Sequence, residues 1–341
     1  MKKVITFGEI MLRLAPNGYM RILQEPSFEA TFGGAEANVA VALANFGDNV
    51  AFVSKVPDHA LGKAAISELK KYGVDTSFIS LGGNRLGVYY MEKGANQRPS
   101  VCIYDREGSS FQESKSTDFD WDKIFEDSEW FHFTGITPAL GDALSEICLA
   151  ACKEAKKRNI SVSCDLNYRA KLWPKEKASY TMEKLCSYVD LLIANEEDAK
   201  QVFGIEAENT DVLSGKIDRV GYQFVAEELK KRFNFSMIAI TLRRSHSASV
   251  NDWSALVYDG NEFFYSQEYH IDHIVDRVGS GDSFGAGLIY ALRHDYDAQN
   301  AVEFAVASAV LKHSIEGDFN RVSLKEVENL VNGNHSGRVQ R

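Results

Sequence analysis

The sequence predicts an α/β fold of three layers, in which helices cover both faces of a mostly parallel sheet and a small β-sheet forms a lid. Strand-like and helix-like segments alternate along the chain, which is the order of repeated βαβ units. Glycine-rich or polar stretches follow the expected strands, where open α/β sheets bind ligands. One pair of strand-like segments has no helix between its members, and this pair predicts the lid.

The elements of the main body follow from hydrophobic patterning and from glycines at helix ends. Gly47 and Gly73 close the first two expected helices. We expect strands in residues 2–9, 50–56, 128–135, 160–167, 189–195 and 235–242, and a hairpin in 254–267. We expect helices in residues 36–47, 60–73, 141–158, 219–232, 283–294 and 297–314.

The expected lid is the hairpin of residues 85–106, and residues 11–30 add one or two strands to it. The alternative is an extra hairpin at the edge of the sheet that does not control access to a ligand. The sequence thus predicts one α/β domain over residues 1–341, with lid strands from about 11–30 and 85–106.

Composition narrows the class of protein. The net charge of −10 and the lack of a basic run argue against nucleic-acid binding. No apolar run reaches the length of about 18–20 residues that a membrane span needs. Five cysteines form no CxxC pair, and Gly8, Glu9 and Arg13 interrupt the N-terminal apolar run, so we expect a cytoplasmic protein and no signal peptide.

The chemistry centres on a glycine loop late in the chain. Gly279, Ser280 and Gly281 precede an expected helix that begins near Asp282 or Ser283, and a helix N-terminus can stabilise charge on a transferring phosphoryl group. Asp282 is expected to be ionised there and to accept the proton of an attacking hydroxyl as a general base. The alternative role for Asp282 is an ordinary helix N-cap.

Two segments together resemble a known family. "FGGAEANVAVALANFG" (32–47) and "DRVGSGDSFGAG" (276–287) are similar to the two signature regions of the ribokinase/PfkB family of sugar kinases, and their order and separation match as well. Within that family the chain looks most like the 2-keto-3-deoxygluconate kinases, on "GVYY", "YDREGS", "TGITPAL", "DLNYRAKLW" and "GDFN". The resemblance implies a ribokinase-like fold and ATP-dependent phosphorylation of a sugar acid, with Mg²⁺, to the 6-phospho product.

The resemblance also implies roles for individual residues. Asp282 is the implied base, and Gly279, Ser280 and Gly281 form the anion hole. The implied substrate-binding residues are Gly34, Asn38, Tyr89, Tyr104, Arg106, Arg169 and Asp318. The implied nucleotide-binding residues are Asn195, Thr241, Arg243, Ser245, Gly279 and Gly281. Asp198 is expected near Mg²⁺ through water, and Asp276 matches a position that in some relatives helps to bind a monovalent cation such as K⁺.

The two arginines favour an acidic substrate. A guanidinium pairs with a planar carboxylate through two parallel hydrogen bonds, whereas a neutral sugar needs no permanent charge. The alternatives for Arg106 and Arg169 are solvation at the surface or pairing with Asp105 and Asp165.

The chain departs from the family pattern in three places. "NEED" ends in Asp198 where Glu is usual, and Ser280 replaces the commoner Ala. The nucleotide segment "TLRRSHSASVNDW" has no glycine, and its residues 243–251 are expected to form a longer loop over the nucleotide.

Three functions therefore stand open. The first is a 2-keto-3-deoxygluconate kinase. The sequence does not show whether its substrate is the gluconate or the C4 epimer, the galactonate. The second is a kinase for a neutral sugar such as fructose or ribose. The third is a sugar-acid-binding regulatory protein, against which the intact Gly279, Gly281, Asp282 and Asn195 argue. A homo-oligomer that pairs through the lid strands is also expected.

Overall fold

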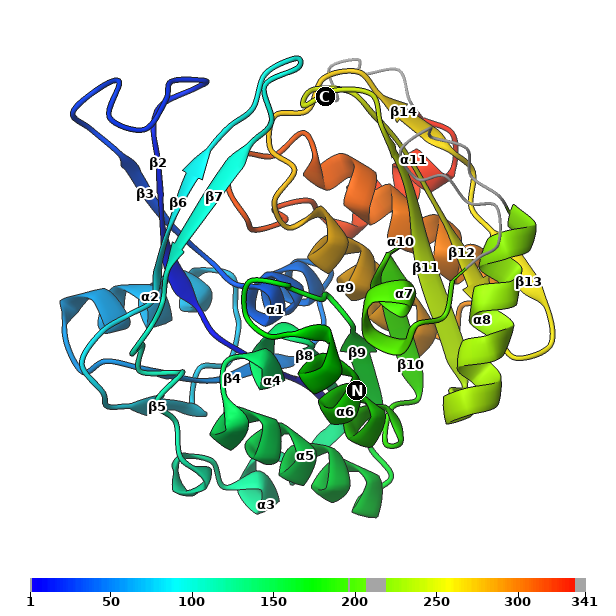
Figure 1. Cartoon of the computed structure of the whole chain (residues 1–341), viewed down its shortest axis with the longest axis horizontal. Helices are drawn as coiled ribbons and strands as arrows, with labels where there is room; N and C mark the ends of the chain where they lie inside the picture. The colour runs from blue at the N-terminus through cyan, green and yellow to red at the C-terminus, as the bar shows by residue number, and fades with distance from the viewer. Residues whose placement is uncertain (1, 196, 207–218, 335–341) are drawn as a thin grey trace.

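The computed structural model describes residues 2–195, 197–206 and 219–334. A sheet of ten strands runs through the body between two layers of helices, and a separate sheet of four strands projects from one side (Figure 1). The expected three-layer α/β/α architecture with a small second sheet is confirmed.

The large sheet is parallel over most of its width. Its strand order is β13 (Phe263–Tyr265), β12 (Asn251–Tyr258), β11 (Met237–Ser245), β10 (Leu191–Asn195), β9 (Ser161–Asp165), β8 (Ser128–Thr134), β1 (Lys3–Phe7), β4 (Val50–Val56) and β5 (Ile79–Leu81). The strands from β11 to β5 pair in parallel, whereas β12 pairs antiparallel with β11, β13 and β14 (Tyr269–Ile271).

Two hydrophobic cores lie on the two faces of this sheet, because successive side chains of a strand point to opposite faces. In β10, Leu192 and Ala194 belong to one core and Leu191 and Ile193 to the other. The first core packs against α5 (Asp142–Lys157), α6 (Lys175–Cys186), α7 (Asp198–Phe203) and α8 (Arg219–Phe233). The second packs against α1 (Ala35–Asn45), α2 (Ala60–Lys71), α9 (Ser280–Arg293), α10 (Ala298–Lys312) and α11 (Leu324–Val331).

The small sheet forms from the two predicted segments. Its order is β3 (Glu29–Gly33), β2 (Met11–Ala15), β6 (Val88–Glu92) and β7 (Val101–Asp105). It rises at the upper left of Figure 1, away from the large sheet. Met11, Ala15, Tyr89 and Met91 give it a small buried core of its own, so one face of this sheet is turned toward the body.

The structure adds elements that the sequence analysis did not name. These are helices α6, α7 and α11, the short strands β5 and β14, the short α3 (Trp121–Ile124) and α4 (Ile136–Ala139), and a 3₁₀ turn at Ser116–Asp118. Helix α9 begins at Ser280, two to three residues earlier than expected. Within the described parts of the chain, no helix combines the length and apolar character of a membrane span.

Candidate active site

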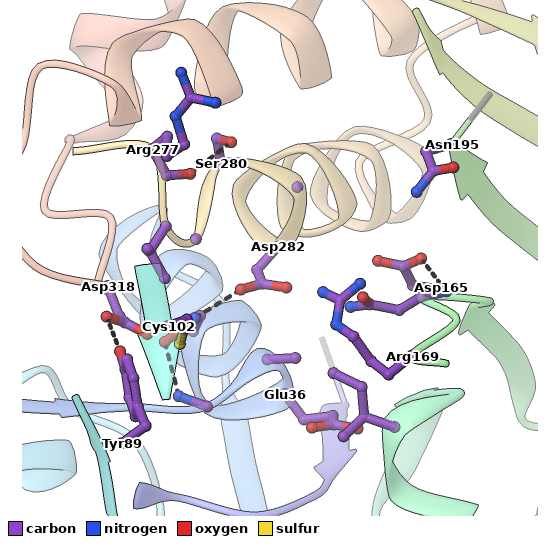
Figure 2. A pocket seen from close by; sticks show the side chains of 18 of the residues that line it. Glu36, Tyr89, Cys102, Asp165, Arg169, Asn195, Arg277, Ser280, Asp282 and Asp318 are labelled. Carbon is purple, nitrogen blue, oxygen red and sulfur yellow. Dashed lines mark hydrogen bonds between the residues drawn. The ribbon is translucent and has the colours of Figure 1, made fainter. Parts of the chain in front are cut away.

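A cavity of about 370 Å³ lies between the small sheet and the carboxyl ends of the parallel strands. Figure 2 shows that Asp282 points into it from the first turn of α9, with Arg169 and Asp165 opposite. The sequence-predicted residues that line it are Gly34, Asn38, Tyr89, Tyr104, Arg106, Arg169, Asn195, Asp198, Thr241, Arg243, Gly279, Ser280, Gly281, Asp282 and Asp318. Ser245 and Asp276 are the two predicted site residues that do not line it.

The glycine loop turns sharply into α9. Gly279 is the N-cap, with φ at 83°, a left-handed conformation that glycine adopts at little cost. A Cβ atom on Gly279 would lie 2.1 Å from the carbonyl oxygen of Asp318, so the position also has no room for a side chain. The alternative of Asp282 as the helix N-cap is wrong, because Gly279 holds that position and Asp282 lies within the first turn.

The carboxyl group of Asp282 is held by Asn38. The Nδ2 atom of Asn38 donates a hydrogen bond of 2.6 Å to Oδ2 of Asp282, and Oδ1 of Asn38 accepts one of 3.3 Å from the Gly34 N–H. Burial raises the pKa of Asp282 to about 7, with further contributions from Asp318 and Glu36, although the bond from Asn38 opposes the rise. Asp282, which the sequence analysis expects to be ionised, is therefore partly protonated near pH 7.

Two more acids face the cavity beside Asp282. Burial raises the pKa of Asp165 well above its usual range, and the charges of Asp198 and Asp282 add to the rise. Burial also raises the pKa of Asp198, whose oxygens accept hydrogen bonds from the N–H groups of Tyr168 (3.1 Å) and Asn195 (3.0 Å). The charges of Asp198 and Asp282 thus disfavour the ionisation of Asp165, and a divalent cation such as Mg²⁺ nearby would relieve that repulsion.

The two candidate arginines differ in their surroundings. Arg106 is buried, and its Nε and Nη2 atoms both donate to Oε2 of Glu9, with the Nε bond at 2.8 Å. Its partner is thus Glu9, and neither surface solvation nor pairing with Asp105 describes it. Arg169 is exposed at the cavity wall, and its Nη1 atom donates to the Tyr168 carbonyl at 3.3 Å.

A buried polar network ties the small sheet to the glycine loop. Arg13, in the centre of β2, is 1% exposed and its Nη1 atom lies 2.7 Å from Oδ1 of Asp318. The Tyr89 hydroxyl donates to the same Asp318 oxygen, and the second terminal nitrogen of Arg13 pairs with Asp276. Tyr89 and Asp318, both predicted substrate ligands, therefore line the cavity while they bind each other.

The surroundings of Asp276 do not fit a binding site for K⁺. Its Oδ2 atom pairs with Arg13 and accepts the Gly317 N–H at 3.2 Å, while Oδ1 accepts the Val278 N–H at 3.0 Å. Donor groups thus contact both oxygens of a carboxylate that is 2% exposed. The suggested monovalent-cation role of Asp276 is corrected to an ion pair with Arg13.

On the expected nucleotide side, residues 243–251 do not form the predicted long loop. β11 continues to Ser245 and β12 begins at Asn251, because the two strands pair in register from Ile238↔Tyr258 to Ser245↔Asn251. Thr241 and Arg243 line the cavity, and Ser245 lies beyond its edge. The side-chain carbonyl of Asn195 accepts the N–H groups of Glu197 (2.8 Å) and Asp198 (3.0 Å), which leads the chain into α7.

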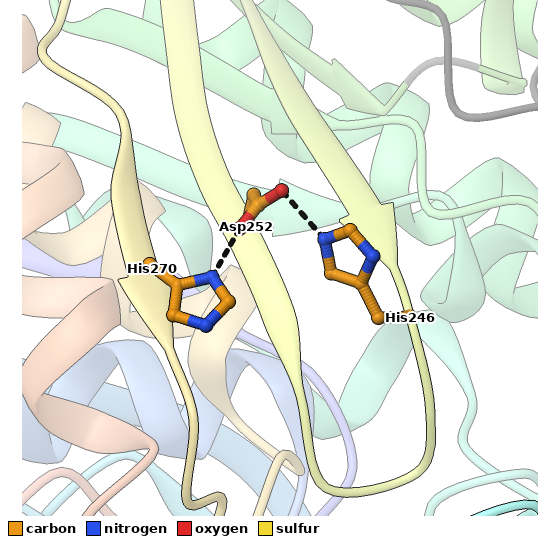
Figure 3. A group of neighbouring side chains, drawn as sticks. All are labelled: His246, Asp252 and His270. Carbon is orange, nitrogen blue, oxygen red and sulfur yellow. Dashed lines mark hydrogen bonds and ion pairs between the residues drawn. The ribbon is translucent and has the colours of Figure 1, made fainter.

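A second group of metal-ligand type lies on the other face of this hairpin (Figure 3). The Asp252 carboxylate accepts from His246 and from His270, each at 2.6 Å, and Arg244 lies 3.5 Å from it. Asp252 alternates with Trp253, which lines the cavity, so this group faces away from it. The Arg244 guanidinium lies against the same carboxylate and would repel a metal ion there. The group is therefore better explained as hydrogen bonds that join neighbouring segments of the sheet than as a metal site.

Sequence reasoning missed several residues of the site. Glu9, Glu36, Asp165 and Arg277 all line the cavity. Arg277 donates to the Ala248 carbonyl at 2.8 Å and so joins the glycine loop to the β11–β12 turn. Arg13 also belongs to the network beside the site, although it does not line the cavity. A charged side chain between apolar ones in "MLRLA" predicts a buried ion-pair partner, so the sequence held a signal for this residue.

A buried carboxyl group in the first turn of a helix, inside a cavity under a small sheet, fits a phosphotransferase for a small hydroxyl compound. The chain belongs to the pfkB family of carbohydrate kinases, whose model matches residues 1–320. It is an enzyme of that kinase class, and the expected family and ribokinase-like fold are confirmed.

Three relatives are similar over nearly the whole chain. The solved structure of 2-dehydro-3-deoxygluconokinase from Thermotoga maritima is 50% identical, has a TM-score of 0.94, and matches 98% of this chain and 100% of that one. A 2-dehydro-3-deoxygalactonokinase from Haloferax volcanii is 32% identical over 98% of both chains. The 2-dehydro-3-deoxygluconokinase of Bacillus subtilis is 26% identical over 94% of this chain and 93% of its own.

Proposed function

We propose that this protein is an ATP-dependent kinase of 2-dehydro-3-deoxygluconate (2-keto-3-deoxygluconate), which it converts to the 6-phospho product. The observation that carries the proposal is the position of Asp282, between the anion-binding terminus of α9 and a cavity whose wall also holds Arg106 and Arg169. The 50% identity to the T. maritima enzyme over 98% of the chain supports the choice of substrate.

In the proposed reaction, Asp282 accepts the proton of the sugar hydroxyl as that oxygen attacks the γ-phosphorus of ATP. Asn38 orients the Asp282 carboxyl group, since its amide fixes one of the two oxygens at 2.6 Å. The N–H groups of Gly279, Ser280 and Gly281 stabilise the charge on the transferring phosphoryl group. The bond from the hydroxyl oxygen to phosphorus forms as the bond from phosphorus to the ADP oxygen breaks.

The substrate's carboxylate is proposed to lie near Arg169 and Arg106. Arg169 is exposed to the cavity and can approach an anion directly. Arg106 shares its charge with Glu9, so we expect it to contribute less than Arg169. Gly34, Tyr89, Tyr104 and Asp318 line the same side and would contact the rest of the sugar acid.

ATP is proposed to lie along Asn195, Thr241 and Arg243, at the carboxyl ends of β10 and β11. Mg²⁺ would be held near Asp165 and Asp198, through water at Asp198, because hydrogen bonds from backbone N–H groups already reach both of its oxygens. When bound, Mg²⁺ supplies positive charge to the phosphates.

A coupled assay of ADP release tests the substrate. Purified protein would receive ATP and Mg²⁺ with 2-dehydro-3-deoxygluconate, fructose or ribose at equal concentration. We expect turnover on the keto acid and little on either neutral sugar. Turnover on a neutral sugar alone would contradict the proposed roles of Arg106 and Arg169.

The galactonate epimer is a second candidate substrate. The H. volcanii relative, named for that epimer, is 32% identical over 98% of this chain, so both epimers belong in the assay. A ratio of kcat/KM for the two epimers of more than about tenfold would identify the preferred one, since that ratio corresponds to about 1.4 kcal/mol of transition-state binding.

We also propose that the whole chain acts as one kinase domain, that the small sheet closes over the substrate as a lid, and that two copies pair through it. The edge strand β7 exposes Val101, Ile103 and Tyr104 by 39%, 49% and 47%. An exposed apolar edge strand invites pairing with another chain. Light scattering on the purified protein gives its mass in solution.

A cytoplasmic location is part of the proposal and accords with five cysteines that are all free.

A further inference from the structure

Lys312, the last residue of α10, lies wholly inside the protein beneath the glycine loop. Its side chain is 0% exposed, and its Cε atom lies 3.5 Å from the place where a side chain on Gly279 would begin. The Nζ atom donates to the backbone carbonyls of Ile315 (3.1 Å) and Asp276 (3.4 Å). These partners are oxygens of the kind that replace the hydration shell of a bound K⁺ ion.

Two carboxylates beside Lys312 favour its charged form and partly offset the burial that leaves its pKa below the usual value. Burial lowers the pKa of Lys312, while the charges of Asp276 and Asp318 raise it and that of Arg13 lowers it. All four groups are less than 5% exposed, and two carboxylates balance one guanidinium and one ammonium. The position at the C-terminal end of α10 adds the favourable field of the helix carbonyls.

We propose that the buried ammonium of Lys312 takes the place of a monovalent metal cation beneath the anion-binding loop, so that phosphoryl transfer needs no added K⁺. This inference rests on the proposed kinase function and deepens it. Lys312 is a positioning residue: it holds the Asp276 carbonyl, three residues before Gly279, and places a positive charge below the helix terminus that receives the phosphoryl group.

The contacts of Asp276, which differ from those of the expected cation ligand, support the same conclusion. That carboxylate is occupied by Arg13 and by two backbone N–H groups, and Lys312 contacts the carbonyl of the same residue. Both the anionic and the carbonyl oxygens of Asp276 are thus bound by the protein's own donors. An ammonium on a four-carbon stem is a compact point charge and can substitute for an alkali ion.

The first test measures native turnover on 2-dehydro-3-deoxygluconate in KCl and in choline chloride at equal ionic strength. We expect the two rates to agree within about twofold. Stimulation by K⁺ of about tenfold or more would overturn the inference while leaving the kinase function in place. A lack of ADP release in both salts would instead contradict the proposed substrate.

Two variants separate the charge from the hydrogen bonds. Lys312→Gln keeps a donor near the carbonyls without the charge, and Lys312→Ala leaves a space that a small cation can enter. In choline chloride we expect both to lose about 10²-fold in kcat with little change in KM. We expect K⁺ or ethylammonium to restore at least about tenfold to Lys312→Ala. Native turnover in Lys312→Gln, or a loss in Lys312→Ala that no cation repairs, would overturn the role.

Thermal melting gives a readout that does not depend on catalysis. We expect Lys312→Ala to melt several degrees higher in KCl than in choline chloride, because an ion that binds only the folded state stabilises it, while the native protein melts alike in both. Equal melting of Lys312→Ala in both salts would contradict a vacated cation site. Lys93→Ala is the matched control, since Lys93 pairs with Glu316 at 2.6 Å near the same segment and should show no cation response.

Discussion

Asp282 has the chemical properties of a general base that is tuned by its surroundings. Burial raises its pKa to about 7, and Asn38 opposes that rise through a hydrogen bond of 2.6 Å. A base with a pKa near the working pH combines a useful fraction of the ionised form with enough basicity to accept a proton. The raised pKa also makes the stability of the fold depend on pH. The protonated Asp282 favours the folded state at low pH, and this contribution is lost as pH rises through about 7.

The pH dependence of the native enzyme follows from this pKa. Asp282 acts only when it is deprotonated, so we expect kcat/KM to fall about tenfold per pH unit below about pH 7 and to level off above it. The measurement is kcat/KM for the sugar acid from pH 5 to 9. A profile that is flat down to pH 5 would show that the catalytic base has an ordinary carboxyl pKa.

Asn38→Ala should move this acidic limb to higher pH. The hydrogen bond from Asn38 lowers the pKa of Asp282, so its removal raises that pKa and leaves less base at pH 7. We expect activity at pH 7 to fall and to recover in large part at pH 9. Asn45→Ala is the control, because Asn45 lies on the same helix but donates to the Asn320 carbonyl and should leave the limb unchanged.

At the scale of single elements, the glycine loop and the start of α9 form one unit. Gly279 allows the left-handed turn, and the next residues begin the helix whose first turn lines the cavity. The loop could be predicted from its sequence because glycine spacing and a following helix are local features. The exact start of α9 could not, because the contact between Gly279 and Asp318 that fixes it is not local.

Gly279→Ala should weaken both fold and activity. The φ of 83° costs a residue with a Cβ atom about 1–3 kcal/mol, and the clash with the Asp318 carbonyl adds to it. Urea unfolding measures the free-energy change. Gly281→Ala is the matched control for stability, since a Cβ atom there meets nothing within 4 Å; equal stability of the two variants would show that the loop is not under this constraint.

At the scale of the whole molecule, a buried network joins three distant parts of the chain. Arg13 in the small sheet binds Asp276 before the glycine loop and Asp318 after α10, across 263 and 305 residues of sequence. The position of the small sheet over the cavity is therefore linked to the loop that receives the phosphoryl group. Separations of this size explain why the sequence predicted the lid strands but not the contacts that hold them.

Arg13→Met should destabilise the protein by about 3–5 kcal/mol. Its removal leaves the buried carboxylates of Asp276 and Asp318 without their guanidinium partner. The free energy of unfolding in urea measures this loss, and the exposed pair of Lys63 and Asp58 gives a control, since Lys63→Met should change it by less than about 1 kcal/mol. A loss below about 1 kcal/mol in Arg13→Met would mean that the network contributes little.

Much of the site was accessible from sequence because strand ends converge on one edge of a parallel sheet. Fifteen of the seventeen predicted site residues line the cavity, yet their charge states and partners could not be predicted. Arg106 pairs with Glu9 across 97 residues, and the pKa of Asp282 depends on burial by the complete fold. The sequence "TLRRSHSASVNDW" predicts a loop where β11 continues to Ser245. Its pairing with β12 extends the strand, and the polar residues of this segment give no local signal of that pairing.

The most direct test of Asp282 as the base of a sugar-acid kinase is the kcat of Asp282→Asn on 2-dehydro-3-deoxygluconate, measured by ADP release at pH 8 beside the native enzyme. We expect kcat to fall by about 10²–10⁴-fold, because the amide cannot accept the proton, while the melting temperature stays equal or rises as a buried charge is removed. Undiminished turnover by a folded Asp282→Asn variant would contradict the assignment.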